Sequence, residues 1–167
     1  ELPSRSRGAA ASVIDALRTT ELDVAVWNWT GSNQTVGWVL RRMAQEMAIH
    51  RADADAAAGR PTDIEPALAS DGIDEFLNGF LWWVKPDAEP VAGSVHIHCT
   101  DVAGEWTVRE HDGGFDVTPE HAKGDCALRG PASDLLLALW RRQPLSSVDV
   151  VGDTDVAARF VAHSALG

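Results

Sequence analysis

The chain has 167 residues, of which 45% are hydrophobic and 23% are charged, and its formal net charge is −11. This length suits one ordinary domain or two small ones with a sizeable hydrophobic core. The acidic balance argues against nucleic acid as a partner, because phosphate binding needs clustered basic residues and Arg41 with Arg42 is one short pair. The sequence contains no run of eighteen apolar residues and no secretory signal at its start. We therefore expect a cytoplasmic protein without a membrane partner.

Two helices are predicted in the first third of the sequence. Apolar residues at helical intervals predict a short helix over residues 7–18. A longer helix is predicted over residues 35–58, with Asn33 or Thr35 as its cap and Gly59 as its end.

A third helix is predicted to begin at Ser70 or Asp71 and to run to Val84, with a linker after it. Beyond residue 92 the period of the apolar residues changes from helical to alternating, which indicates strands. Asp112–Gly113 is a strong hairpin signal. The remaining predicted elements are strands over residues 94–100, 105–110, 115–119, 125–130 and 146–152 and helices over residues 131–142 and 153–165.

These elements predict an α+β protein with two domains. Residues 1–85 form a helical domain, and residues 86–167 form a small α/β domain whose sheet is mostly antiparallel.

The main candidate site lies on the helix over residues 35–58. The predicted buried stripe of this helix consists of Leu40, Met43, Met47 and Ala54. His50 projects about 40° from this stripe and Glu46 about 80° from it, on the same side. Because residues four apart on a helix are neighbours, the imidazole and the carboxylate can bind one cation, and Asp53 can orient the imidazole. The same residues, with Arg42 one turn before Glu46, equally fit a salt-bridged helix margin.

The other histidines have simpler interpretations. His96 and His98 share one face of a strand, where a second metal site is conceivable, but we interpret that face as solvated. His111 and His121 are expected at the surface, in or beside turns. His163 is expected to complement the dipole at the end of the last helix.

Cysteine and tryptophan residues are expected to be structural. Cys99 and Cys126 belong to no Cys-x-x-Cys pair, so we expect buried free thiols rather than a disulfide or a zinc ribbon. Trp27, Trp29 and Trp38 are expected to fill the core between the helices, and the alternative is that a tryptophan near the cleft contacts a ligand.

Four segments, which together cover nearly all of the chain from Trp27 onward, resemble the actinobacterial family of mycothiol-dependent maleylpyruvate isomerase-like proteins. The segments are WVLRRMAQEMAIHRADADAAAG, LASDGIDEFL, VHIHCTDVAGEWTV and HAKGDCALRGPASDLLLALWRR.

The resemblance implies a fold and a metal site. It implies a partial DinB-like helical bundle in residues 1–85, followed by a sterol-carrier-protein-like domain. Glu46 and His50 match the Glu-x-x-x-His pair with which the family holds a divalent metal, usually zinc. The family's early histidine ligand is expected on helices before residue 1. Either this sequence is the C-terminal portion of a longer protein, or this version has lost the complete site. Gln45 stands where the family commonly has histidine, and we expect it to face solvent.

The resemblance also implies a function. A metal-bound mycothiol thiolate would act as a nucleophile in an isomerase or thiol-transferase reaction on a small anionic substrate, with Arg129 as the catalytic residue that binds this substrate. Arg129 equally fits an ordinary surface charge at the end of a strand. The alternative is a non-enzymatic sterol-carrier-like module that binds a hydrophobic ligand or a protein partner.

Overall fold

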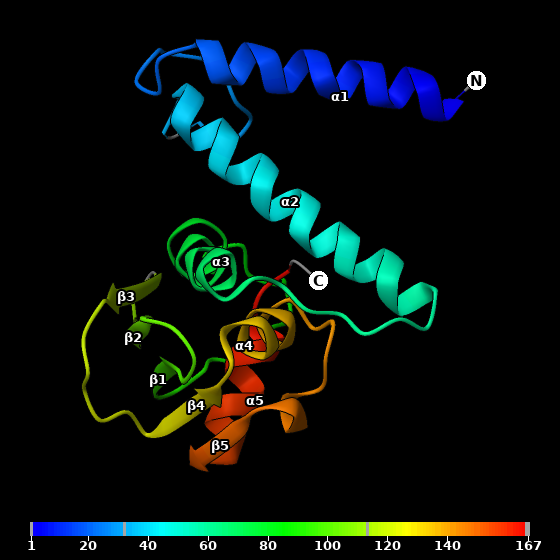
Figure 1. The fold of residues 1–167 in the computed structure, drawn as a ribbon. Coiled ribbons are helices and arrows are strands. Elements are labelled where there is room, and N and C mark those ends of the chain that lie inside the picture. The colour runs from blue at the N-terminus through cyan, green and yellow to red at the C-terminus, as the bar shows by residue number, and fades with distance from the viewer. Residues whose placement is uncertain (1, 32, 113, 166–167) are drawn as a thin grey trace. The chain divides into compact units, whose positions relative to one another are not determined.

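The computed structural model describes residues 2–31, 33–112 and 114–165 (Figure 1), and the contacts within the chain divide it into two compact units. Unit 1 comprises Glu1–His50 and unit 2 comprises Arg51–Gly167. The described residues form five α-helices, one short 3-10 helix and one five-stranded sheet. The predicted α+β class is therefore confirmed. None of the described helices is both long enough and apolar enough to cross a bilayer.

Unit 1 contains helix α1 (Leu2–Thr19) and most of helix α2 (Val36–Ala57). The hydroxyl oxygen of Thr35 accepts a hydrogen bond from the backbone N–H of Trp38 at 3.3 Å, so Thr35 caps α2 as expected. Gly59, just beyond α2, has a φ of +65°, a conformation that favours glycine and that ends the helix where the sequence predicts.

The buried face of α2 differs from the predicted one. Leu40, Met43 and Met47 are 38%, 41% and 67% exposed, so the predicted stripe is wrong. Apart from Val36 at its first position, the buried positions of α2 are Arg42, Gln45, Ala48, Ile49 and Ala52. This second set also has helical spacing, and the long stems of its polar members bury alongside the small apolar residues. Gln45, expected in solvent, is consequently only 2% exposed.

The expected core role of the first two tryptophans is also wrong. Trp27 and Trp29 are 78% and 52% exposed, whereas Asn28 between them is buried. The Asn28 side-chain oxygen accepts hydrogen bonds from the backbone N–H and the hydroxyl of Thr30. The buried residue at this point of the chain is therefore Asn28, and both neighbouring tryptophans are exposed.

Unit 2 is built on a sheet of strand order β3-β2-β1-β4-β5. The strands are β1 (Ser94–Cys99), β2 (Glu105–His111), β3 (Gly114–Thr118), β4 (Cys126–Gly130) and β5 (Asp149–Gly152). The pair β1–β4 is parallel and the other three pairs are antiparallel, which confirms the mostly antiparallel sheet. His111 pairs with Gly114 at the predicted hairpin, while Gly113 lies outside the described residues.

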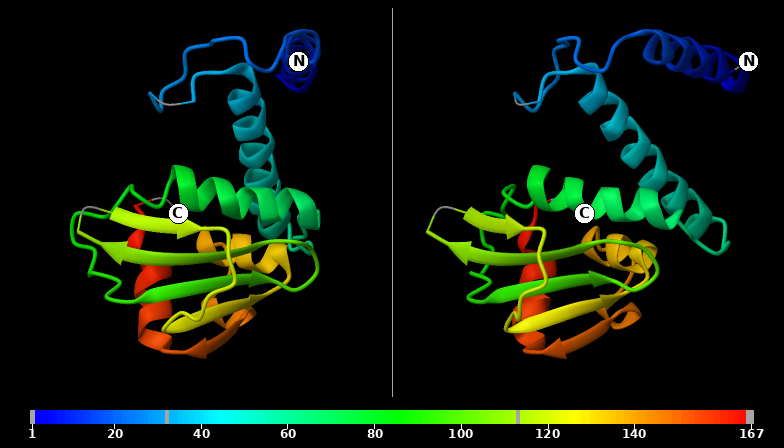
Figure 2. Two further views of the ribbon diagram at one scale, coloured as in Figure 1. Left: turned by 90° about the vertical axis from the view of Figure 1, so that its left-hand side faces the viewer. Right: turned by 60° about the vertical axis from the view of Figure 1, so that its left-hand side comes forward.

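Helices α4 (Ala132–Leu139) and α5 (Thr154–His163) pack against the sheet, and α3 (Pro66–Gly79) packs against α4. Figure 2 shows α4 and α5 behind the strands and α3 above them. A short 3-10 helix, Leu145–Ser147, precedes β5. Helix α3 begins earlier than predicted because Glu65 caps it, accepting a hydrogen bond from the Leu68 N–H at 2.8 Å.

Helix α3 belongs to unit 2, whereas the sequence places a domain boundary after residue 85. Ile73 and Phe76 are buried, and the Phe76 ring meets Trp140 edge-on with ring centroids 5.5 Å apart. The indole N–H of Trp106, on β2, donates to Asp74 at 3.3 Å. These contacts join α3 to α4 and to the sheet.

Alternation along β1 separates two environments. Val95 and Ile97 are fully buried, and His96 and His98 project from the opposite face. The connection between β3 and β4, residues 119–125, crosses that opposite face in front of the strands (Figure 2). It is tied down by a hydrogen bond from the Thr107 hydroxyl to the carbonyl oxygen of Glu120 at 3.1 Å.

Candidate functional site

Glu46 and His50 lie one turn apart on α2, with 3.6 Å between Glu46 Oε2 and His50 Nε2. The same carboxylate oxygen accepts a hydrogen bond from Arg42 Nη2 at 2.8 Å. The side chain of Glu46 is 43% exposed and that of His50 is 61% exposed. The expectation that His50 points into a buried bundle is therefore wrong. The structure therefore brings the predicted pair together, and it also contains the salt bridge of the alternative interpretation.

Asp53, the expected partner of the imidazole, forms an ion pair with Arg142. Arg142 Nε donates to Asp53 Oδ1 at 3.0 Å, and its Nη2 donates to Oδ2 at 3.3 Å. Arg142 also donates to the carbonyl oxygen of Trp140 at 2.9 Å. This two-point contact holds the last turns of α2 to the end of α4 within unit 2.

Arg129, the predicted substrate-binding residue, is exposed on β4 in unit 2. Its Cα is paired with that of His98 across the parallel β1–β4 ladder, and Ala127 is paired with His96 in the same way. Paired residues project from the same face of a sheet. Arg129 therefore emerges beside the histidines of β1, on the face away from the helices.

Three histidines and one glutamate meet on that face. Glu105 Oε1 lies 2.8 Å from His96 Nε2, 2.9 Å from His98 Nδ1 and 2.5 Å from His121 Nδ1. The ligand atoms of His96, Glu105 and His121 all lie within 4.8 Å of one another. The rings of His96 and His121 are nearly perpendicular, with centroids 4.9 Å apart. We name these four residues the histidine cluster.

The sheet explains how the histidine cluster forms. His96 and His98 share a face of β1, and the antiparallel register sets Glu105 of β2 opposite His98. His121 is added by the connection that crosses this face. The side chain of His96 is only 9% exposed, so the interpretation as a solvated face is wrong for His96, whereas the side chain of His98 is 34% exposed. The expected surface position of His121 is confirmed, since its side chain is 77% exposed.

Sequence reasoning missed Glu105 and the participation of His121. The sequence places two predicted strands, residues 94–100 and 105–110, next to each other along the chain. Pairing these two strands as a hairpin would have placed Glu105 near His98. No local pattern shows that residue 121 folds back over β1, because the loop's course depends on contacts made after the sheet has formed.

Glu105 is strongly acidic in this setting. Its pKa is lowered from 4.5 to about 2, first by the hydrogen bond from His121 and then by those from His98 and His96, which outweigh the opposing effect of desolvation. An ionised carboxylate only accepts hydrogen bonds. Each of the three ring nitrogens that face Glu105 is therefore a donor.

Both cysteines are free and buried, as expected. Burial is the main cause that raises the pKa of each thiol to about 11, and nearby carboxylates, Asp101 for Cys99 and Asp153 for Cys126, act in the same direction. At neutral pH both thiols are protonated, so neither suits the role of a nucleophile.

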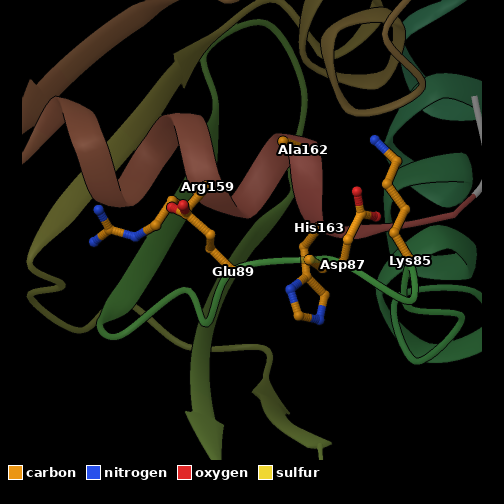
Figure 3. A pocket seen from close by; sticks show the side chains of 7 residues that line it. Lys85, Asp87, Glu89, Arg159, Ala162 and His163 are labelled. Carbon is orange, nitrogen blue, oxygen red and sulfur yellow. The ribbon is translucent and has the colours of Figure 1, made fainter.

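A pocket of about 250 Å³ adjoins the end of α5. Its charged and titratable lining residues are Lys85, Asp87, Glu89, Arg159 and His163 (Figure 3). The side chains of Lys85 and Asp87 extend to one side and the His163 ring to the other in Figure 3. His163 ends α5 as expected, but it is buried rather than exposed at the helix terminus. Because these groups have both signs of charge and do not converge, we assign no site there.

Two solved structures are similar to parts of this chain. One, described as "UbiJ-SCP2 Ubiquinone synthesis protein", is 23% identical with a TM-score of 0.44, and the similarity covers 57% of this chain and 92% of that chain. The other, Sterol Carrier Protein 2 Like 2 from Aedes aegypti, is 18% identical with a TM-score of 0.33, covering 72% of this chain and 95% of that chain. No curated protein matches the sequence.

Two family models match the chain. The model described as "Mycothiol maleylpyruvate isomerase N-terminal domain" matches residues 1–55, and the model described as "MDMPI C-terminal domain" matches residues 67–159. The first match contains Glu46 and His50, and the second contains the sheet and Arg129. Together the two matches span most of the sequence, with the N-terminal domain model before the C-terminal domain model. The chain therefore belongs to the mycothiol maleylpyruvate isomerase family.

Proposed function

We propose that this protein catalyses a mycothiol-dependent isomerisation or thiol transfer on a small anionic substrate, with a divalent metal, zinc by preference, held by Glu46 and His50. The proposal depends on one observation above all. In a chain of this family, a carboxylate and an imidazole stand one helical turn apart with their ligand atoms 3.6 Å from each other.

The donor set fits such a metal. An imidazole nitrogen and a carboxylate oxygen are both zinc ligands, and Glu46 and His50 would supply two of the three protein ligands usual in a catalytic site. Both side chains are partly exposed, so a cation can reach them. Arg42 occupies one lone pair of Glu46 Oε2, which leaves Oε1 and the remaining lone pairs for the metal.

When bound, the metal supplies a Lewis acid that lowers the pKa of a coordinated thiol. Cys99 and Cys126 are buried and protonated at neutral pH, so neither can supply the nucleophilic thiolate. This favours a thiol that comes from a separate cofactor. Arg129 offers an exposed guanidinium, whose planar donors suit a substrate carboxylate. We propose that Arg129 binds and orients the anionic substrate. The cytoplasmic location stays a prediction.

The test is an assay of the full-length protein with zinc, mycothiol and maleylpyruvate. We expect turnover that requires both zinc and mycothiol. Glu46→Gln and His50→Ala should each lower kcat/KM at least about tenfold, since losing a ligand weakens metal binding. His111→Ala removes an exposed histidine of unit 2 and serves as the control, with activity unchanged.

Two outcomes contradict the proposal. If turnover is equal in the wild type, Glu46→Gln and His50→Ala, then Glu46 and His50 do not hold the catalytic metal. Absence of mycothiol-dependent turnover in the zinc-loaded wild type rejects the enzyme and favours the non-catalytic binding module.

A further inference from the structure

We propose that His96, Glu105 and His121 form a second metal site, separate from Glu46 and His50, that binds one divalent transition-metal ion, zinc by preference. His98 orients the carboxylate of Glu105 in this site. Two imidazoles and one carboxylate are a donor set that zinc takes in catalytic sites, with a fourth position left open.

The first argument is convergence. Three ring nitrogens lie within 2.9 Å of one atom, Glu105 Oε1. A carboxylate has about four lone-pair positions shared between two oxygens, so this crowding on one oxygen is not needed to satisfy the carboxylate. Tetrahedral zinc needs its donors about 3.4 Å apart. The ligand atoms of His96, Glu105 and His121 already lie within 4.8 Å of one another. Small side-chain movements, with transfer to solvent of the ring protons that point at Glu105, then enclose an ion.

The second argument is support by the fold. His96 lies on the central strand of the sheet and is nearly buried. The connection that carries His121 lies so close to β1 that a Cβ at Gly124 would be 2.9 Å from the carbonyl oxygen of Ser94 and 3.0 Å from the nitrogen of His96. Only glycine permits this approach. The ligands are therefore held by strands and by a tightly packed connection.

The third argument is access. A cavity of about 420 Å³ is lined by His96 and His121 together with Lys123 and Asp125. This volume has room for a water molecule or a small anion at the open coordination position. Among the charged residues of this lining, Lys123 is positive and Asp125 is negative, so the cavity itself favours neither sign of charge in the fourth ligand.

The second site does not depend on the proposed function. Its ligands all lie in unit 2, whereas Glu46 and His50 lie in unit 1. A protein with an active first site and no second site, or the reverse, is physically possible. The two can be separated by mutating each set of ligands in turn.

The experiment is a zinc titration by calorimetry of the full chain carrying Glu46→Ala and His50→Ala, so that the first site does not contribute. We expect one zinc ion per chain to remain bound. In this background His121→Ala and Glu105→Gln should each weaken zinc binding by more than about 100-fold, beyond the loss caused by removing an outer-shell partner. His98→Gln should weaken it by about 10-fold to 100-fold, the range for an orienting residue.

His111→Ala in the same background is the matched control, because His111 is an exposed histidine on β2 that does not belong to the histidine cluster. It should leave zinc binding unchanged. His121 is exposed and Glu105→Gln preserves the side-chain shape, so both variants should fold, and circular dichroism checks this. A cobalt(II) titration provides a second readout, in which the tetrahedral absorption bands should be lost in His121→Ala.

Zinc binding that is absent in the background protein overturns the proposal, as does binding that His121→Ala and Glu105→Gln leave unchanged. Either result would identify the histidine cluster as a hydrogen-bonded group without a metal role.

Discussion

Arg129 and His98 occupy paired positions on neighbouring strands, and this pairing decides what surrounds each side chain. The guanidinium emerges on the face of the histidine cluster, away from the helices. A single residue's shift in register would move Arg129 to the apolar side of the sheet, where Leu128 is buried. At the scale of residues, strand alternation therefore places the positive charge.

We predict that Arg129→Gln raises KM for the anionic substrate about tenfold or more, because a hydrogen bond to a charged group contributes about 1.5–3 kcal/mol. If Arg129 binds substrate and transition state equally, kcat stays close to wild type. Steady-state kinetics measures both constants, and Arg18→Gln, an exposed arginine of α1, is the control. An unchanged KM in Arg129→Gln contradicts the substrate-binding role.

Helix ends and helix faces differ in how well their roles follow from local sequence. Asp153 caps α5 as predicted, and its Oδ1 accepts hydrogen bonds from the N–H groups of Asp155 at 2.9 Å and Val156 at 3.1 Å. The apolar residues of α2, in contrast, are distributed around the helix, so two of its faces compete for burial. At the scale of elements, a cap is local chemistry and a buried face depends on neighbours.

Removal of the α5 cap should destabilise the protein. Asp153→Ala leaves two backbone N–H groups without their acceptor, and we expect the free energy of unfolding to fall by about 1 kcal/mol. Asp153→Asn retains a capping oxygen and should cost only a few tenths of this value. Urea denaturation measures the three proteins, and equal losses for alanine and asparagine would show that the cap contributes nothing.

The molecule as a whole protects its thiols inside unit 2. Cys99 and Cys126 lie at opposite ends of the paired β1 and β4 segments, and the side chains of both face the covered side of the sheet. Leu128, Leu135 and Phe160, which belong to the sheet and its helices, are each at most 2% exposed. The core of unit 2 thus combines β4 with α4 and α5.

Thiol labelling should report on the opening of this core. Because burial and raised pKa values disfavour the thiolate, we predict that a disulfide reagent at pH 8 modifies Cys99 and Cys126 only as fast as the core opens. The labelling rate should rise steeply with added urea. Cys126→Ser shows which thiol reacts, and rapid labelling of either one in the native protein would contradict this prediction.

The sequence alone determined the α+β class, the strand positions, the Asp153 cap and the proximity of Glu46 to His50. These follow from periods and spacings within about ten residues, where backbone geometry fixes which side chains are neighbours. The family resemblance, which the two family models confirm, likewise rests on linear motifs.

Only the tertiary structure decided which face of α2 is buried and which side chains join His96. The first choice was open because Met43 and Ile49 lie on different faces of one helix, and local pattern does not rank them. The second depends on Glu105 arriving through strand pairing and on His121 arriving through a connection packed across β1. Contacts between residues distant in sequence are set by packing and chain closure, which no local spacing encodes.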